Sequence, residues 1–348
     1  MACAGTFRPL NRHRSPVVRR RERWLAGAAT LGVAAVGLGL TRRRQRTVGV
    51  SWRDPGPAAG AHPLAVRDSG GGDAVTVLLL HGLAGSSRYW GADYDTLATD
   101  GRLVVADLLG FGSSPRPPGR YDLHEHVDAV MATLDDLDVT GPVVIGAHSV
   151  GSIIAAGVAA RAPDRVAGLV LFGPPLYTSS DQARLRIGGL GGLGRLLALD
   201  TPLAHRVCGW MCGHRALAAR IAVVLRPDLP AAIARDSVQH NWVSYAGTMR
   251  NVTIDGNTAR GLTDAIDAMK QTEPIGATRP DLTVHIIVGD RDLVPDFDVL
   301  EALAAANPSL RVDHWDGAHD VPLRNPRRCI AAIKDMRDAA TLRPQGQR

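Results

Sequence analysis

Short apolar runs alternate with amphipathic stretches along most of the chain. The run at residues 75–80 is almost continuously apolar, which is typical of a strand covered on both faces of a sheet. The runs lie at residues 75–80, 102–106, 142–145, 166–172, 284–288 and 310–315. Helical patterns separate several of them, at residues 123–137, 153–162 and 327–339. This order predicts an α/β fold whose mostly parallel central sheet has right-handed crossovers and flanking helices.

The alternation stops between about residues 176 and 280. This stretch shows helical patterns and no convincing strand. It therefore predicts a helical insertion in a core that residues 61–175 and 281–340 form. Apolar residues are frequent in the insertion, among them Leu185, Leu193 and Trp210. Two interpretations remain open: these side chains line a pocket for an apolar substrate, or they pack only against the core.

Ser149 follows one of the apolar runs and precedes an alanine-rich helical pattern. The residues around it are small, namely Gly146, Ala147 and Gly151. A tight turn from strand to helix exposes a serine oxygen, and the N-terminus of the helix favours negative charge beside it. Taken alone, a serine in this position could equally be the N-cap of the helix.

Three further motifs follow apolar runs in a fixed order. The glycine-containing turn at 81–86 follows the run at 75–80 and can direct a backbone N–H at a reacting carbonyl oxygen. Asp290 and Asp292 follow the run at 284–288, and His319 follows the run at 310–315. The resulting order of serine, aspartate and histidine differs from that of chymotrypsin and of subtilisin.

Together these motifs resemble the α/β-hydrolase superfamily, over about residues 61–340. The matching segments are 81–82, 107–114, 147–151, 289–295 and 317–319. The chain departs from the family pattern at Ala147, where glycine is usual. The resemblance implies an α/β-hydrolase fold, with the insertion at 176–280 as a helical cap over the active site.

The resemblance also implies a catalytic triad. Ser149 is the implied nucleophile, His319 the implied base and Asp292 the carboxylate that orients the base. Asp290 and His314 are the nearby alternatives for the last two roles. We expect the backbone N–H groups of residues 83 and 150 to receive the oxyanion.

Those two oxyanion donors belong to Leu83 and Val150, and with the triad they predict a serine hydrolase. The expected reaction is cleavage of a carboxylic ester of a lipophilic small molecule or lipid through an acyl-enzyme. No metal or organic cofactor is expected, and the run His124-Glu125-His126 lacks the spacing of a zinc protease. The alternatives are a carbon–carbon bond hydrolase or perhydrolase-like relative, and a non-catalytic, membrane-tethered binding protein.

Charge is distributed unevenly along the chain. The net charge is +6, but residues 1–46 contain eleven arginines and one glutamate, a local charge of +10. The rest of the chain therefore carries −4. A mildly acidic catalytic domain argues against binding of nucleic acid.

The N-terminal segment contains an uncharged apolar run at residues 24–40, with clusters of arginine on both sides. Its length is at the short end of the roughly 17–25 residues that span a bilayer as a helix. We predict a membrane anchor in the basic segment 1–46, followed by a linker at 47–60. The side of the membrane stays open, and an export signal is the alternative. The sequence makes no prediction of oligomeric state.

Overall fold

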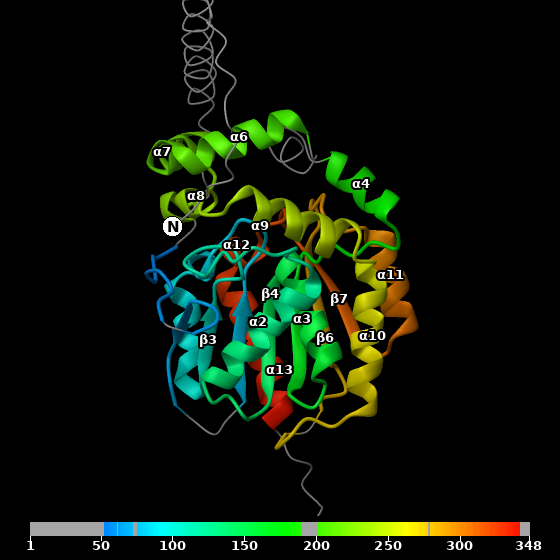
Figure 1. Cartoon of the computed structure of the whole chain (residues 1–348). Coiled ribbons are helices and arrows are strands. Elements are labelled where there is room, and N and C mark those ends of the chain that lie inside the picture. Colours follow the sequence, from blue (N-terminus) through cyan, green and yellow to red (C-terminus); the bar gives the residue numbers. More distant parts are fainter. Residues whose placement is uncertain (1–51, 61, 72–74, 190–200, 278, 342–348) are drawn as a thin grey trace, which may run out of the picture. The chain divides into compact units, whose positions relative to one another are not determined.

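The computed structural model describes residues 52–60, 62–71, 75–189, 201–277 and 279–341 (Figure 1). All of them belong to one compact unit, Val50–Arg348. The predicted anchor at 24–40 lies outside the described residues. Within the described residues, no helix is both long and apolar enough to cross a membrane.

A central sheet of seven strands organises this unit. Its order is β1-β3-β2-β4-β5-β6-β7, and only β1 runs antiparallel to its neighbour. The strands are β1 Val66–Asp68, β2 Thr76–Leu80, β3 Leu103–Ala106, β4 Val143–His148, β5 Val166–Phe172, β6 Val284–Gly289 and β7 Leu310–Trp315. The predicted α/β fold with a mostly parallel sheet is confirmed. The sequence analysis did not predict β1.

Helices cover both faces of the sheet, as Figure 1 shows. One face packs against α2 Leu123–Asp136, α3 Val150–Arg161, α10 Thr258–Gln271 and α11 Phe297–Ala306. The other packs against η1 Ser87–Trp90, η2 Ala92–Asp100, α12 Val321–Arg324 and α13 Pro326–Thr341. Alternate residues of one strand enter the two cores: Leu78 and Leu80 on one side, Val77 and Leu79 on the other. Burial on both faces explains why the strands read as continuous apolar runs.

A group of helices lies over one edge of the sheet (Figure 1). Its described members are α4 Ser180–Gly189, α6 Pro202–Gly213, α7 Arg215–Leu225, α8 Ala231–Asp236, α9 Trp242–Gly247 and the π-helix η3 Thr248–Ile254. We call this group the cap. The predicted boundary at residue 280 differs from the structure, because α10 packs on α3 in the main core. The helical pattern of α10 was visible in the sequence, but the surface that it packs against was not.

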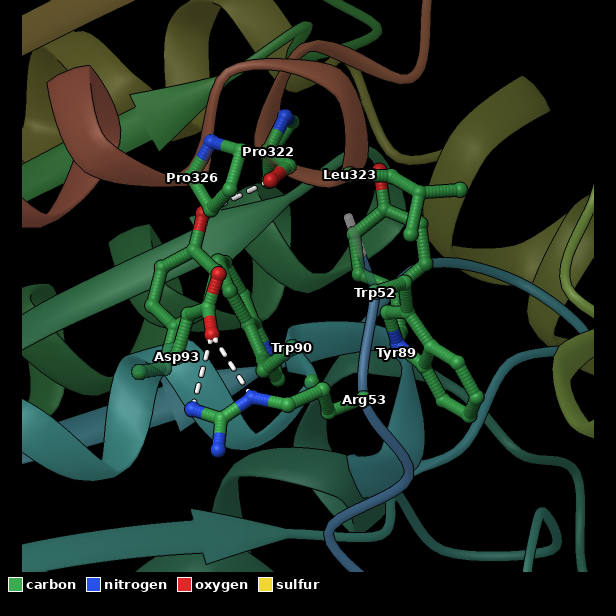
Figure 2. Close-up of a pocket in the computed structure, with 10 residues that line it drawn as sticks. Trp52, Arg53, Tyr89, Trp90, Asp93, Pro322, Leu323 and Pro326 are labelled. Atoms are coloured by element: carbon green, nitrogen blue, oxygen red, sulfur yellow. Dashed lines mark hydrogen bonds and ion pairs between the residues drawn. The ribbon is translucent and has the colours of Figure 1, made fainter. Parts of the chain in front are cut away.

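Residues 52–59 form a strap that lies against the body, although they fall within the predicted linker 47–60. The indole N–H of Trp52 donates a hydrogen bond to the Arg88 carbonyl oxygen at 3.1 Å. Arg53 forms an ion pair with Asp93 at 3.0 Å, as Figure 2 shows. Trp52 also lines a small pocket together with Tyr89 of η1. These contacts attach the strap to the body, so residues 52–59 are not a free linker.

Candidate active site

Ser149 occupies the turn between β4 and α3. Its backbone has φ 53° and ψ −125°, a conformation that is strained for a residue with a side chain. The Ser149 N–H donates a hydrogen bond to the Phe172 carbonyl oxygen at 2.8 Å, which ties the turn to the end of β5. Its side chain is half-buried, at the start of α3. The turn thus holds the serine hydroxyl at the N-terminus of a helix.

Small residues around Ser149 are required by close packing. A Cβ atom added to Gly151 would lie 2.5 Å from the carbonyl oxygen of His81. A Cβ atom added to Gly82 would lie 3.0 Å from the Cβ of Ser149. Ala147, the departure from the family pattern, is fully buried in β4, so its methyl group is accommodated in the core. The tight turn and the loop after β2 therefore touch.

Asp292 and His319 are paired at the same edge of the sheet. Asp292 follows β6 and His319 follows β7, and Nδ1 of the histidine lies 2.8 Å from Oδ2 of the aspartate. The other carboxylate oxygen of Asp292 accepts the N–H of Val294 at 2.9 Å. The Asp292 side chain is fully buried, whereas that of His319 is 27% exposed. A buried carboxylate holding a partly exposed imidazole is the arrangement that orients a general base.

The charge of Asp292 controls the protonation of His319. Burial alone would lower the pKa of His319, but the hydrogen bond and the charge of Asp292 outweigh burial and raise it from 6.5. If Nδ1–H faces Asp292, Nε2 is the atom free to accept a proton. A raised pKa makes this imidazole a stronger base than a free histidine.

Gly173 brings the pair close to Ser149. It follows Phe172 in the chain and has φ 56°, a conformation that favours glycine. A Cβ atom here would lie 2.9 Å from Oδ2 of Asp292 and 3.0 Å from Nδ1 of His319. The end of β5 thus contacts both the serine turn and the aspartate–histidine pair.

The two alternative residues make other contacts. Oδ1 of Asp290 accepts the Gly317 N–H at 2.9 Å, which joins the aspartate loop to the histidine loop. His314 lies on β7, with Nε2 2.9 Å from a carboxylate oxygen of Glu301. The structure therefore brings Asp292 and His319 together and leaves Asp290 and His314 outside this pair.

The loop after β2 is held in place by His81. This histidine is fully buried, and its Nε2 accepts the Leu108 N–H at 2.9 Å. Nδ1 must then carry the proton, and it donates to the Gly82 carbonyl oxygen at 2.7 Å. Burial lowers the pKa of His81, in keeping with a neutral ring. His81 thereby fixes the loop from which Leu83 would donate.

Leu83 and Val150 flank Ser149 on two sides. Leu83 follows Gly82, which packs against the serine, and Val150 is the first residue of α3. Within the described part of the chain, the N–H of neither residue donates a hydrogen bond to another group. Two unpaired N–H groups beside a serine suit the binding of an oxyanion.

Asp107 holds the residues that directly follow the loop after β2. Its two carboxylate oxygens accept the N–H groups of Ser87 at 2.5 Å and Ser113 at 2.7 Å. A Cβ atom on Gly112 would collide with this carboxylate, which explains the glycine at that position. The motif at 107–114, noticed in the sequence only as a resemblance, is thus a structural support for the start of η1.

His148 has contacts that sequence reasoning missed. It is buried at the end of β4, and Nε2 donates a hydrogen bond to the carbonyl oxygen of His319 at 3.0 Å. Its ring stacks on Tyr89 with a centroid distance of 4.6 Å and lies 4.7 Å from the ring of His319. Burial, and then the nearby His319, lower the pKa of His148 well below 6.5. Its position before Ser149 was visible, but a contact across 171 residues was not.

The run His124-Glu125-His126 begins α2 and forms no metal site. His126 is buried, with Nε2 2.9 Å from Oγ1 of Thr248, and burial lowers its pKa to about 4. His126 therefore faces the interior of the protein rather than solvent. Among the described residues, no group of three or more His, Cys, Asp or Glu residues is placed to hold a metal ion.

Comparisons with known proteins agree with this geometry. A family model described as the alpha/beta hydrolase fold matches residues 75–206. A probable lysophospholipase of Arabidopsis thaliana, BODYGUARD 5, is 27% identical over 277 residues, which are 74% of this chain and 60% of that protein. The 1-acylglycerol-3-phosphate O-acyltransferase ABHD5 of Rattus norvegicus is 27% identical over 63% of this chain and 64% of its own length. The chain thus spans about 60% of the first of these relatives.

Solved structures show the same fold. A thermophilic esterase from Thermogutta terrifontis aligns with a TM-score of 0.53 and 23% identity, over 80% of this chain and 94% of that one. An esterase from Rhodococcus, RhEst1, aligns with a TM-score of 0.56 and 20% identity, over 83% and 99%. The sheet order and the family model over residues 75–206 show that the chain has the α/β-hydrolase fold, and the relatives described above show that it is similar to members of the α/β-hydrolase superfamily.

Proposed function

We propose that this protein is a serine hydrolase that cleaves a carboxylic ester of a lipophilic small molecule or lipid. The observation that carries the proposal is the 2.8 Å contact between Asp292 and His319, which Gly173 places beside the strained turn of Ser149. The names of relatives, a probable lysophospholipase and an acyltransferase of a glycerol lipid, favour an acyl group on a lipid.

The proposed reaction has two halves. Oγ of Ser149 attacks the acyl carbon while Nε2 of His319 takes the hydroxyl proton. The N–H groups of Leu83 and Val150 stabilise the oxyanion, and His319 then returns the proton to the leaving alcohol. Water attacks the acyl-enzyme with His319 again as base, which releases the acid and restores Ser149.

Two measurements test this proposal together. A fluorophosphonate probe should label the wild-type protein, and p-nitrophenyl esters of rising chain length should be hydrolysed. Ser149→Ala should abolish both, whereas Ser152→Ala, one helical turn away, should keep both. Labelling of Ser149 without ester turnover would favour the carbon–carbon bond hydrolase or perhydrolase-like alternative. Absence of labelling in the wild type would favour the binding protein.

We also propose that residues 1–46 hold the protein at a membrane, because the apolar run at 24–40 lies between arginine clusters. The full-length protein should then sediment with membranes and resist extraction by alkaline carbonate. Removal of residues 1–46 should release a folded, active enzyme, because both cores lie in the unit Val50–Arg348. A shortened form outside the cell would instead indicate an export signal.

A further inference from the structure

Helices α6 and α7 form the outer layer of the cap (Figure 1). Their inward faces bear small residues: Ala204 and Cys208 on α6, and Ala218 and Ala219 on α7 are buried. In Figure 1, α8 and α9 lie between this layer and the sheet. The opposite faces of α6 and α7 therefore point away from the body of the protein.

Those outward faces are apolar. Leu203 and Trp210 on α6, and Leu217 and Val224 on α7, are between 42% and 59% exposed. The members of each pair are seven positions apart, which is two helical turns, so they share one face of their helix. Exposed large apolar side chains that share a helix face mark a place of interaction.

An arginine lies within each apolar face. Arg206 stands between Leu203 and Trp210 at helical spacing, and Arg220 stands in the same way between Leu217 and Val224. Both arginines are exposed, and neither forms an ion pair with any residue that the structure describes. From Pro202 to Leu225 the sequence contains no Asp or Glu. The outward faces are thus apolar, and the charged side chains on them are all positive.

This combination selects one kind of partner. A second copy docking by a twofold axis would bring Arg206 and Arg220 against their own equivalents, and like charges oppose that contact. The segment 1–46 carries a local charge of +10 and is repelled for the same reason. An anionic bilayer offers phosphate groups to guanidinium and an apolar layer to Leu and Trp at matching depths.

The chain itself limits the distance to a membrane. Residues 41–51 separate the apolar run at 24–40 from Trp52, which is fixed on the body by its hydrogen bond to Arg88. Eleven extended residues span at most about 40 Å. Arg88 in turn forms an ion pair with Asp236 of α8 at 3.6 Å, so Trp52 is attached next to the cap. Chain length alone therefore keeps the end of the apolar run within about 40 Å of Trp52.

From these observations we propose that the outward faces of α6 and α7 dock the cap onto the surface of an anionic phospholipid bilayer. Arg206 and Arg220 bind lipid phosphate, while Leu203, Trp210, Leu217 and Val224 enter the headgroup region. The inference rests on the proposed function and extends it, because a cap docked on the bilayer lies at the point where a lipid substrate leaves the bilayer. Docking is a binding event and does not require turnover.

The test uses protein without residues 1–46, so that the predicted anchor does not mask docking by the cap. Flotation with vesicles of phosphatidylcholine alone is compared with flotation in which phosphatidylglycerol is added. The wild type should partition onto the anionic vesicles. Arg206→Glu/Arg220→Glu should reduce that partition by at least about tenfold. Arg260→Glu/Arg327→Glu, which changes the same charge on exposed sites of α10 and α13, should not.

A second variant tests the apolar contact without changing charge. Trp210→Ala/Leu217→Ala should also weaken binding to anionic vesicles, with circular dichroism and thermal melting as checks that each variant is folded.

Equal loss of vesicle binding in both arginine double variants would overturn the proposal, as would equal binding to vesicles with and without anionic lipid. A concentration-dependent dimer that Leu217→Asp abolishes would assign the surface to a second copy. Vesicle binding without ester turnover would overturn the proposed function alone, and turnover without binding the docking alone.

Discussion

At the scale of single residues, His148 links the parts of the candidate active site. Its ring packs between Tyr89 and His319, and its N–H holds the carbonyl oxygen of His319. It also touches the loop after β2, because a Cβ atom on Gly82 would lie 2.9 Å from its Nδ1. A neutral imidazole suits this place, since a second positive ring beside His319 would oppose protonation of the base.

His148→Phe should therefore lower kcat by about tenfold with little change in KM. Phenylalanine keeps the stacking on Tyr89 but leaves the His319 carbonyl without its donor, so the base loses its alignment. Steady-state kinetics on a short p-nitrophenyl ester measures the effect. His314→Ala, at the exposed histidine paired with Glu301, serves as the control and should leave kcat near the wild-type value. A rise in KM alone would mean that His148 contacts substrate instead.

The pairing of Asp292 with His319 predicts a pH dependence. The base must be neutral to accept a proton, and its pKa is raised above 6.5. Activity should consequently fall as the pH drops, with the midpoint of the acid limb of kcat/KM above 6.5. Asp292→Asn removes the charge that raises this pKa, so the midpoint should move to lower pH while kcat falls by about 10⁴.

Asp290→Asn is the matched variant for that measurement. It removes a carboxylate that receives the N–H of Gly317, yet it does not touch His319. It should keep the midpoint of the wild type and lose far less activity. The opposite ranking of the two asparagine variants would assign the acid role to Asp290.

At the scale of elements, the ends of the strands set the geometry of the site. The serine turn, the end of β5 and the loops after β6 and β7 meet where side chains would not fit. Gly173 shows the effect best, because both its φ of 56° and its distances to Asp292 and His319 exclude a Cβ atom. Close packing at this strand end, together with the hydrogen bond from the Ser149 N–H to the Phe172 carbonyl oxygen, thus sets the positions of the candidate catalytic groups.

Gly173→Ala should thus lower the free energy of unfolding by at least about 1–3 kcal/mol, the cost of a strained backbone, and should abolish most turnover. Thermal melting and kcat measure the two effects. Gly188→Ala in α4 is the control, because no atom lies within 4 Å of the added Cβ and alanine favours a helix. A Gly173→Ala protein with normal kcat would show that the aspartate–histidine pair can move without loss of turnover.

At the scale of the whole molecule, the contacts of the strap make residues 52–59 part of the folded body. Protein that starts at residue 47 keeps Trp52 and Arg53 in place, whereas protein that starts at residue 60 loses both contacts with η1 and η2. Loss of a half-buried tryptophan and its hydrogen bond should cost about 2 kcal/mol and lower Tm by several degrees. Melting curves of the two proteins decide this, and equal Tm values would mean that the strap contributes no stability.

The sequence predicted the sheet well because its central strands, β2 to β5, are buried along their whole length. Six of the seven strands coincide with predicted runs, with ends within a few residues of those observed. The short β1, with one exposed and one half-buried residue among three, left no such signal. Motifs located Ser149, Asp292 and His319, whose roles stay predictions. The contacts of His148 and the packing of α10 join segments far apart in the chain, and no local pattern records them.

The serine turn has a consequence for hydrogen exchange. The amide of Ser149 is bonded to the Phe172 carbonyl between two central strands, β4 and β5, whose residues are all buried. An amide in this place exchanges with solvent only when the whole sheet opens, whereas amides of the peripheral helices exchange through local openings. Its exchange rate therefore reports the global stability of the protein, measured at the residue that bears the strain.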